Sequence, residues 1–144
     1  MNTQDINRKI APASESLSFS GFPAFTEKKI NDRFPCYCFE NFNSEVVRLD
    51  IVVDAGSWIQ QKPLQASSMA RMMTEGTKEY NAFRIAETID FSGAYLDVTA
   101  SNHNTTISIF AVKHILEKLF PLLRSIMTES VFPEEEFRVI LANN

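Results

Sequence analysis

The clearest pattern along the chain is an alternation of apolar and polar residues. It runs through Val46–Asp54, where apolar residues at every second position, Val47, Leu49, Ile51 and Val53, alternate with Arg48, Asp50 and Asp54. Such a period-two pattern is typical of a strand with one face in the core. Alternation and β-branched or aromatic content predict five strands, at Ala24–Ile30, Cys36–Glu40, Val46–Asp54, Ala94–Ala100 and Ile107–Val112.

Apolar residues at helical spacing predict helices between and after these strands. The first is expected to begin at Pro63 and to be closed by Gly76 in a left-handed conformation. Methionines supply much of its apolar stripe and are expected to fill the core. A second helix is predicted at Asn81–Gly93, with Asn81 as its N-cap. A third covers Lys113–Thr128 and should bend at Pro121, which removes a backbone hydrogen bond.

A fourth helix is predicted to begin at Pro133, because three glutamates follow it and the helix dipole favours negative charge in the first turn. This helix is expected to be still running at Asn144, so the chain is expected to be cut short. Its apolar residues Phe137, Ile140 and Leu141 would then need a partner surface, from another copy or another chain.

The order of the elements is three strands, two helices, two strands and two helices. It predicts an α+β fold, with an antiparallel sheet of at least four strands and helices packed on one face. Residues 1–21 hold few large apolar residues and are rich in Ser. They are therefore expected to form an N-terminal arm, followed by one domain over residues 22–144.

Charge and composition argue against several kinds of partner. The net charge is −4 and the longest run of cations is Lys28-Lys29, so neither nucleic acid nor a membrane surface is an expected partner. No apolar run is long enough to span a bilayer, and the first twenty residues lack the core of a secretory signal, so a cytoplasmic location is expected. Cys36 and Cys38 should be reduced thiols on one strand face, because a metal site would need more Cys or His nearby.

Five short segments follow one another between Pro23 and Leu141. They are the strand that ends in Gly56-Ser57, the pair Gly76-Thr77, the junction Ile89–Tyr95, the turn Ser101–Thr106 and the segment Val131–Phe137. Their order and spacing resemble the N-terminal part of an insulinase or pitrilysin-type zinc peptidase domain, the family that includes mitochondrial processing peptidase. The resemblance implies that residues 22–144 are a truncated half-domain of this insulinase-type metallopeptidase fold.

The chemistry of that family resides in an inverted zinc motif, His-x-x-Glu-His, on the helix before the Gly-Thr pair. Two imidazoles hold the zinc, and the Glu takes a proton from the zinc-bound water. Anchored on Gly76-Thr77, the motif falls on Ser67, Ala70 and Arg71, which all differ from it. The resemblance therefore implies degenerate motif positions, with no catalytic residue, no metal ligand and no zinc cofactor here.

The chain's two histidines do not replace the motif. His103 falls in a predicted turn and His114 at the start of a predicted helix. A zinc site built on these two would lack a third clear ligand. We therefore expect ordinary surface or capping roles for both.

The resemblance implies an inactive zinc protease homologue, because some members of the family work as heterodimers in which one half keeps the motif. On this interpretation the chain is a structural or peptide-holding partner of an active zinc peptidase subunit, or of another copy of itself. Two alternatives stay open. The chain could be a fragment of an active zinc metalloendopeptidase whose site lies in other segments, or a peptide- or protein-binding module with no peptidase partner.

Overall fold

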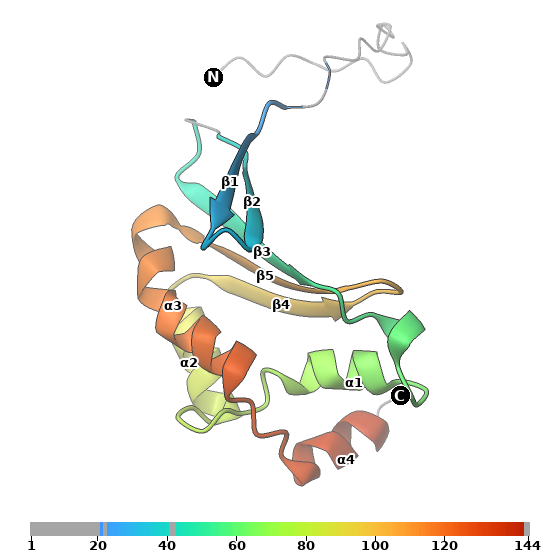
Figure 1. The fold of residues 1–144 in the computed structure, drawn as a ribbon. Helices are drawn as coiled ribbons and strands as arrows, with labels where there is room; N and C mark the ends of the chain where they lie inside the picture. Colours follow the sequence, from blue (N-terminus) through green and yellow to red (C-terminus); the bar gives the residue numbers. More distant parts are fainter. Residues whose placement is uncertain (1–20, 22, 41–42, 143–144) are drawn as a thin grey trace, which may run out of the picture. The chain divides into compact units, whose positions relative to one another are not determined.

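The computed structural model describes residue 21 and residues 23–40 and 43–142 (Figure 1). The chain divides into two compact units, residues 1–41 and residues 42–144. The arm predicted for residues 1–21 lies, apart from Gly21, outside the described residues, and so does the predicted continuation of the final helix after Ala142. No helix within the described part of the chain is long and apolar enough to cross a bilayer.

The first unit contains a β-hairpin. β1 (Thr26–Ile30) pairs antiparallel with β2 (Phe34–Cys38). The connection turns at Asn31 and Asp32, whose φ angles are 52° and 56°. Two successive left-handed residues are typical of a type I′ turn, whose twist matches that of the strands it joins. Asn and Asp tolerate this conformation better than other residues with a Cβ atom.

The second unit is built on a three-stranded antiparallel sheet. Its strands are β3 (Val46–Val53), β4 (Tyr95–Ala100) and β5 (Thr105–Val112), in the order β3-β5-β4. The predicted pairing of the first long strand with the later hairpin is therefore confirmed. The prediction of one sheet with at least four strands is wrong, because the five described strands form separate sheets of two and three. Alternation identifies a strand but does not say which strand it pairs with.

Helices cover one face of this sheet (Figure 1), so the predicted α+β fold is confirmed. They are α1 (Gln65–Met72), α2 (Ala82–Phe91) and α3 (Lys113–Thr128), whereas α4 (Glu134–Ala142) packs on α1, on the side away from the sheet. Alternate residues of β5 meet the inner stripes of the helices to form the core. Its buried members are Met73, Ile85, Ile89, Ile107, Ile109, Ala111, Leu116, Leu119, Leu122, Leu123 and Ile126.

Three of the predicted helices agree closely with the structure. Asn81 caps α2, with its side chain accepting a hydrogen bond from the backbone N–H of Arg84 at 2.9 Å. α3 has the predicted bounds, and Pro121 lies inside it. α4 begins directly after Pro133 with three glutamates in its first turn. Capping located α2, negative charge in the first turn located α4, and apolar spacing located α3.

α1 differs from its prediction at both ends. Pro63 lies in a turn before the helix, and Leu64 at the N-cap has a φ of 64°, which turns the chain before the first helical residue. Gly76 does not close the helix. It lies four residues beyond Met72, has a φ of 153°, and forms an isolated bridge with Asn81. A side chain at that φ would be strained, so the glycine serves the loop between α1 and α2.

Candidate functional site

The three positions to which the sequence resemblance assigns the zinc motif, Ser67, Ala70 and Arg71, all lie on α1. Ser67 and Arg71 are exposed, whereas Ala70 is only 2% exposed. Residues four apart share one face of an α-helix, so Ser67 and Arg71 lie one turn apart, with Ala70 beside them and turned toward the interior. The helix thus presents Ser67 and Arg71 to solvent and buries Ala70.

The side chains at these positions do not fit a zinc ion. The Ser67 hydroxyl donates a hydrogen bond to the Leu64 carbonyl at 3.1 Å, and Ala70 ends in a methyl group. Arg71 carries a fixed positive charge and has no lone pair to offer. Zinc sites in proteins use imidazole, thiolate or carboxylate ligands. Among the described residues, no three or more His, Cys, Asp and Glu side chains gather closely enough to hold a metal ion.

The charge of Arg71 acts on a neighbouring carboxylate, that of Glu75. Partial burial raises the pKa of Glu75, the charge of Glu136 raises it further, and the charge of Arg71 partly opposes both. Glu136 belongs to the first turn of α4. The guanidinium charge therefore acts on an acidic surface where α4 begins.

The Gly76-Thr77 pair joins three helices. The Thr77 hydroxyl oxygen accepts hydrogen bonds from the backbone N–H of Tyr80 at 3.0 Å and from the Ser125 hydroxyl at 2.9 Å. The Gly76 carbonyl accepts from the backbone N–H of Val131 at 3.1 Å. The loop after α1 is thereby fixed to the end of α3, which explains in physical terms why this pair serves as a landmark in the sequence.

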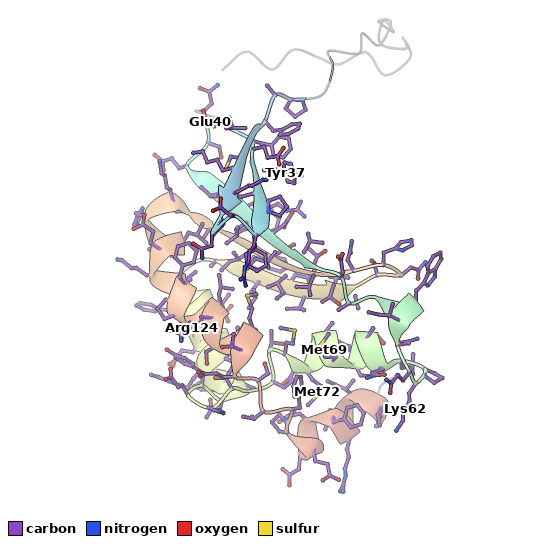
Figure 2. All side chains as sticks on the ribbon, viewed as in Figure 1. Tyr37, Glu40, Lys62, Met69, Met72 and Arg124 are labelled. Carbon is purple, nitrogen blue, oxygen red and sulfur yellow. The ribbon has the colours of Figure 1, made fainter. Side chains whose placement is uncertain are left out.

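A groove lies between α1 and α4, which pack against one another. Its volume is about 670 Å³, within the usual range for a ligand pocket. Lys62, Met69 and Met72, which contribute to it, are labelled in Figure 2. The lining is mainly apolar and consists of Gln61, Lys62, Pro63, Leu64, Gln65, Ser68, Met69, Met72, Phe132, Glu134, Phe137 and Leu141.

The α1–α4 groove does not contain the motif positions. Neither Ser67 nor Ala70 nor Arg71 lines it, because Met69 and Met72 lie on a different side of the helix. Sequence analysis did not identify this groove. The signal for it was available in Leu141 and the other apolar residues of α4, but their neighbour across the groove could not be deduced from periodicity.

Two bulky residues of the groove have left-handed backbone conformations. The φ of Leu64 is 64° and that of Phe132 is 48°. Side chains with a Cβ atom disfavour this region, and a residue that precedes proline, as Phe132 does, is normally extended. Strained residues of this kind cluster at binding and catalytic sites. Both of these residues lie at the α1–α4 groove.

The tip of the β4–β5 hairpin holds one of the two exposed histidines. The backbone N–H groups of Ser57 and Trp58 donate to the carbonyls of Ser101 and Asn102 at 2.9 and 3.0 Å. The ring of Trp58 lies edge-on to that of His103, with 4.3 Å between centroids. His114 is exposed in the first turn of α3, at the other end of β5 from this tip.

Gly56 makes this close approach possible. Its φ is −98°, so no left-handed conformation requires a glycine there. A Cβ atom at Gly56 would instead overlap the backbone carbonyl of Asn102. The residue is glycine because two backbone segments touch.

Comparisons with known proteins agree with this architecture. The chain matches the family described as insulinase (peptidase family M16) over residues 38–141. No curated protein sequence matches it. Among solved structures, the inactive domain of a peptidase of family M16 from Pseudomonas fluorescens has a TM-score of 0.73 at 16% identity, over 81% of this chain and 29% of that one. A protease from Helicobacter pylori has a TM-score of 0.72 at 17% identity, over 84% and 30%.

At such low identity these structures show a shared fold alone, and the chain spans less than a third of the length of either. The family match covers more than half of the chain, including the whole three-stranded sheet and all of α1, α2 and α3. On that match, the chain belongs to the insulinase family of peptidases, family M16.

Proposed function

We propose that this chain is a non-catalytic member of the insulinase family that acts as a structural or peptide-holding partner of an active zinc peptidase subunit. One observation carries the proposal. The helix that should bear the zinc motif has Ser67, Ala70 and Arg71 at the motif positions, and none of them is an imidazole or a carboxylate.

The buried position is the most informative of the three. Ala70 stands where the family has the Glu that acts as general base, and a methyl group cannot accept a proton. With only 2% of its surface exposed, Ala70 is packed as part of the interior of the fold. The similarity to a solved M16 domain described as inactive agrees with this assignment.

The α1–α4 groove supports the peptide-holding part of the proposal. Apolar side chains such as Met69 and Phe137 offer a surface for an apolar peptide side chain, and Lys62 and Glu134 offer opposite charges near them. Pockets of this size with few polar groups are typical of binding sites. The same groove supports one runner-up, a peptide-binding module that works without a peptidase partner.

Metal and activity measurements test the non-catalytic assignment. The full chain would be dialysed against trace zinc, analysed for metal, and assayed for peptide cleavage with and without a chelator. The metal analysis uses Cys36→Ser/Cys38→Ser protein, so that zinc held by thiols is not counted. We expect neither zinc near one per chain nor cleavage. Stoichiometric zinc together with cleavage that a chelator abolishes would overturn the proposal.

Rebuilding the motif gives a second test. Ser67→His/Ala70→Glu/Arg71→His protein regains the two imidazole ligands and the carboxylate base of the motif, but two protein ligands are fewer than the three of a catalytic zinc site. We therefore expect only a partial gain in zinc affinity and no cleavage. Ser67→Ala/Arg71→Ala is the matched control, since it changes the same helix without adding ligands.

A peptide-binding measurement separates the partner role from the module. Leu64→Asn removes an apolar side chain from the groove and relieves a strained φ, because Asn tolerates the left-handed conformation. We expect this variant to be at least as stable as the wild type but weaker, by about tenfold, in binding an apolar peptide library. If an active subunit that co-purifies with the chain strengthens peptide binding, the result favours the partner role. If the active subunit leaves peptide binding unchanged, the result favours the peptide-binding module.

A further inference from the structure

β3 is an open edge of the three-stranded sheet. The order β3-β5-β4 places β3 and β4 at the two edges, and within the described residues no further strand pairs with either. Natural sheets guard such edges with very short strands, with Lys or Pro, or with a bulge. β3 has eight residues in unbroken register and contains neither Lys nor Pro, and its residues Val46 and Val52 are 55% and 58% exposed. An edge of this kind is suited to pairing with another strand.

The backbone groups that face this edge belong to alternate residues of β3. The N–H of Lys113 donates to the carbonyl of Glu45 at 3.0 Å, which continues the register of β3 and β5 by one residue. Bonded pairs alternate along an antiparallel ladder, so the odd-numbered residues of β3 bond to β5 and the even-numbered ones point outward. Arg48 and Asp50 therefore direct their backbone N–H and C=O groups to the open edge.

The charges of Arg48 and Asp50 match an antiparallel copy of the same strand. A twofold axis at Leu49 places Arg48 of each copy directly opposite Asp50 of the other. Each of these pairs can exchange two backbone hydrogen bonds, and side chains directly opposite one another interact. A register shifted by two residues in either direction would set Arg48 against Arg48 or Asp50 against Asp50, and like charges directly opposite are destabilising. The sequence of β3 thus favours a single register with itself.

We propose that the edge of β3 binds the edge of β3 in a second copy of this chain, so that two three-stranded sheets join into one. Within one copy, Arg48 and Asp50 already form an ion pair of 2.9 Å, so in the joined sheet two cations and two anions gather on one face. Val46 of each copy meets Val52 of the other at the ends of the ladder. The Ser44 hydroxyl bonds to both the N–H and the C=O of Val46, so these ends contribute side-chain contact and the centre contributes the backbone bonds.

A charge-swap experiment tests this pairing by analytical ultracentrifugation. Every chain, including the parent, carries Val139→Lys/Leu141→Glu, so that association through α4 is reduced. Arg48→Glu and Asp50→Lys should each weaken self-association at least about tenfold, because each sets like charges opposite one another twice. An equimolar mixture of the two variants should associate as the parent does, since every facing pair is again complementary, and this recovery also shows that both variants fold. Arg84→Glu is the matched control, because it also reverses the cation of an exposed ion pair and should associate like the parent.

Amide hydrogen exchange on the parent chain locates the edge that is used. Exchange at Arg48 and Asp50 should slow as the concentration rises. Exchange at Leu96 and Val98, whose N–H groups face the opposite edge on β4, should not change. A parent that stays monomeric, protection of the β4 amides instead, or self-association that neither charge reversal weakens would overturn the proposal. A monomer in which Arg48 and Asp50 are already protected would overturn it too, because another segment of the same chain would then occupy the edge.

Discussion

The hydroxyl of Ser125 donates a hydrogen bond of 2.9 Å to the hydroxyl oxygen of Thr77, 48 residues earlier in the chain. Only 3% of Ser125 and 6% of Thr77 is exposed. The bond joins the inner face of α3 to the loop that separates α1 from α2. Because both groups are shielded from water, solvent cannot replace a lost partner, and without Thr77 the Ser125 hydroxyl keeps only a bond of 3.4 Å to the Glu129 carboxylate.

Thr77→Val should therefore destabilise the chain by about 1–3 kcal/mol, as the backbone N–H of Tyr80 also loses its acceptor. Ser125→Ala should cost about 1 kcal/mol, and the double variant should show a coupling of at least 0.5 kcal/mol. Urea unfolding measures all three. Thr128→Ala, which removes an exposed hydroxyl of α3, is the control, and a loss there equal to that in Thr77→Val would contradict the prediction.

Gly56→Ala should destabilise the chain by about 2–4 kcal/mol, because the new methyl group would overlap the Asn102 backbone and force the two segments apart. Ser57→Ala changes the neighbouring residue and loses only an exposed bond to the Asn102 side chain, so it should cost under about 1 kcal/mol. Thermal unfolding compares the two. Equal stability of Gly56→Ala and wild type would show that the hairpin tip can move away freely.

Substitutions at the three motif positions should differ in their effect on the stability of the chain. Ser67→His and Arg71→His alter exposed side chains and should change the stability by no more than about 0.5 kcal/mol each. Ala70→Glu places a carboxylate at a buried position and should destabilise the chain by about 2–4 kcal/mol. Denaturant unfolding at neutral pH gives the comparison. A stable Ala70→Glu chain would mean that the fold still has room for the missing base.

Glu75→Gln should raise the stability at neutral pH. The folded chain raises the pKa of Glu75, through burial first and then the charge of Glu136. Its ionised form is therefore disfavoured by folding, and the stability falls as the pH rises through the raised pKa. At a pH below the ordinary glutamate range, the variant and the wild type should be equally stable. Unfolding from pH 3 to 8 tests the sign, and Glu117→Gln on α3 is a control.

The final helix should promote association. The prediction that Ile140 needs an outside partner is wrong, because Ile140 is buried where α4 packs on α1. Val139 and Leu141 are 55% and 47% exposed. Light scattering should show concentration-dependent association that Val139→Lys/Leu141→Glu reduces, while Ile140→Ala lowers the stability. A wild-type chain that stays monomeric at all concentrations would contradict the predicted association.

Local signals in the sequence located most elements correctly. α3 was predicted with its full bounds because seven apolar residues repeat at helical spacing, and α2 because Asn81 is a strong cap. The start of α1 was placed two residues early, since Pro63 suits a first helical position and nothing in the sequence shows that Leu64 adopts a left-handed conformation. Such backbone conformations are imposed by tertiary contacts.

The candidate site was only partly predictable. The positions Ser67, Ala70 and Arg71 were assigned by counting back from Gly76-Thr77, but which of them is buried depends on how α1 rests on β4. The α1–α4 groove joins segments about seventy residues apart, such as Met69 and Leu141. Periodicity describes one element at a time, so it could not bring these two together.

Trp58 is the only tryptophan in the chain, and it is 73% exposed against the ring of His103. Intrinsic tryptophan emission will therefore report on a single corner, where the short turn before α1 meets the β4–β5 tip. Circular dichroism will instead follow the helices. If the fluorescence changes at a lower denaturant concentration than the circular dichroism, this corner opens before the helices unfold. A denaturation curve recorded by fluorescence alone would then understate the stability of the core.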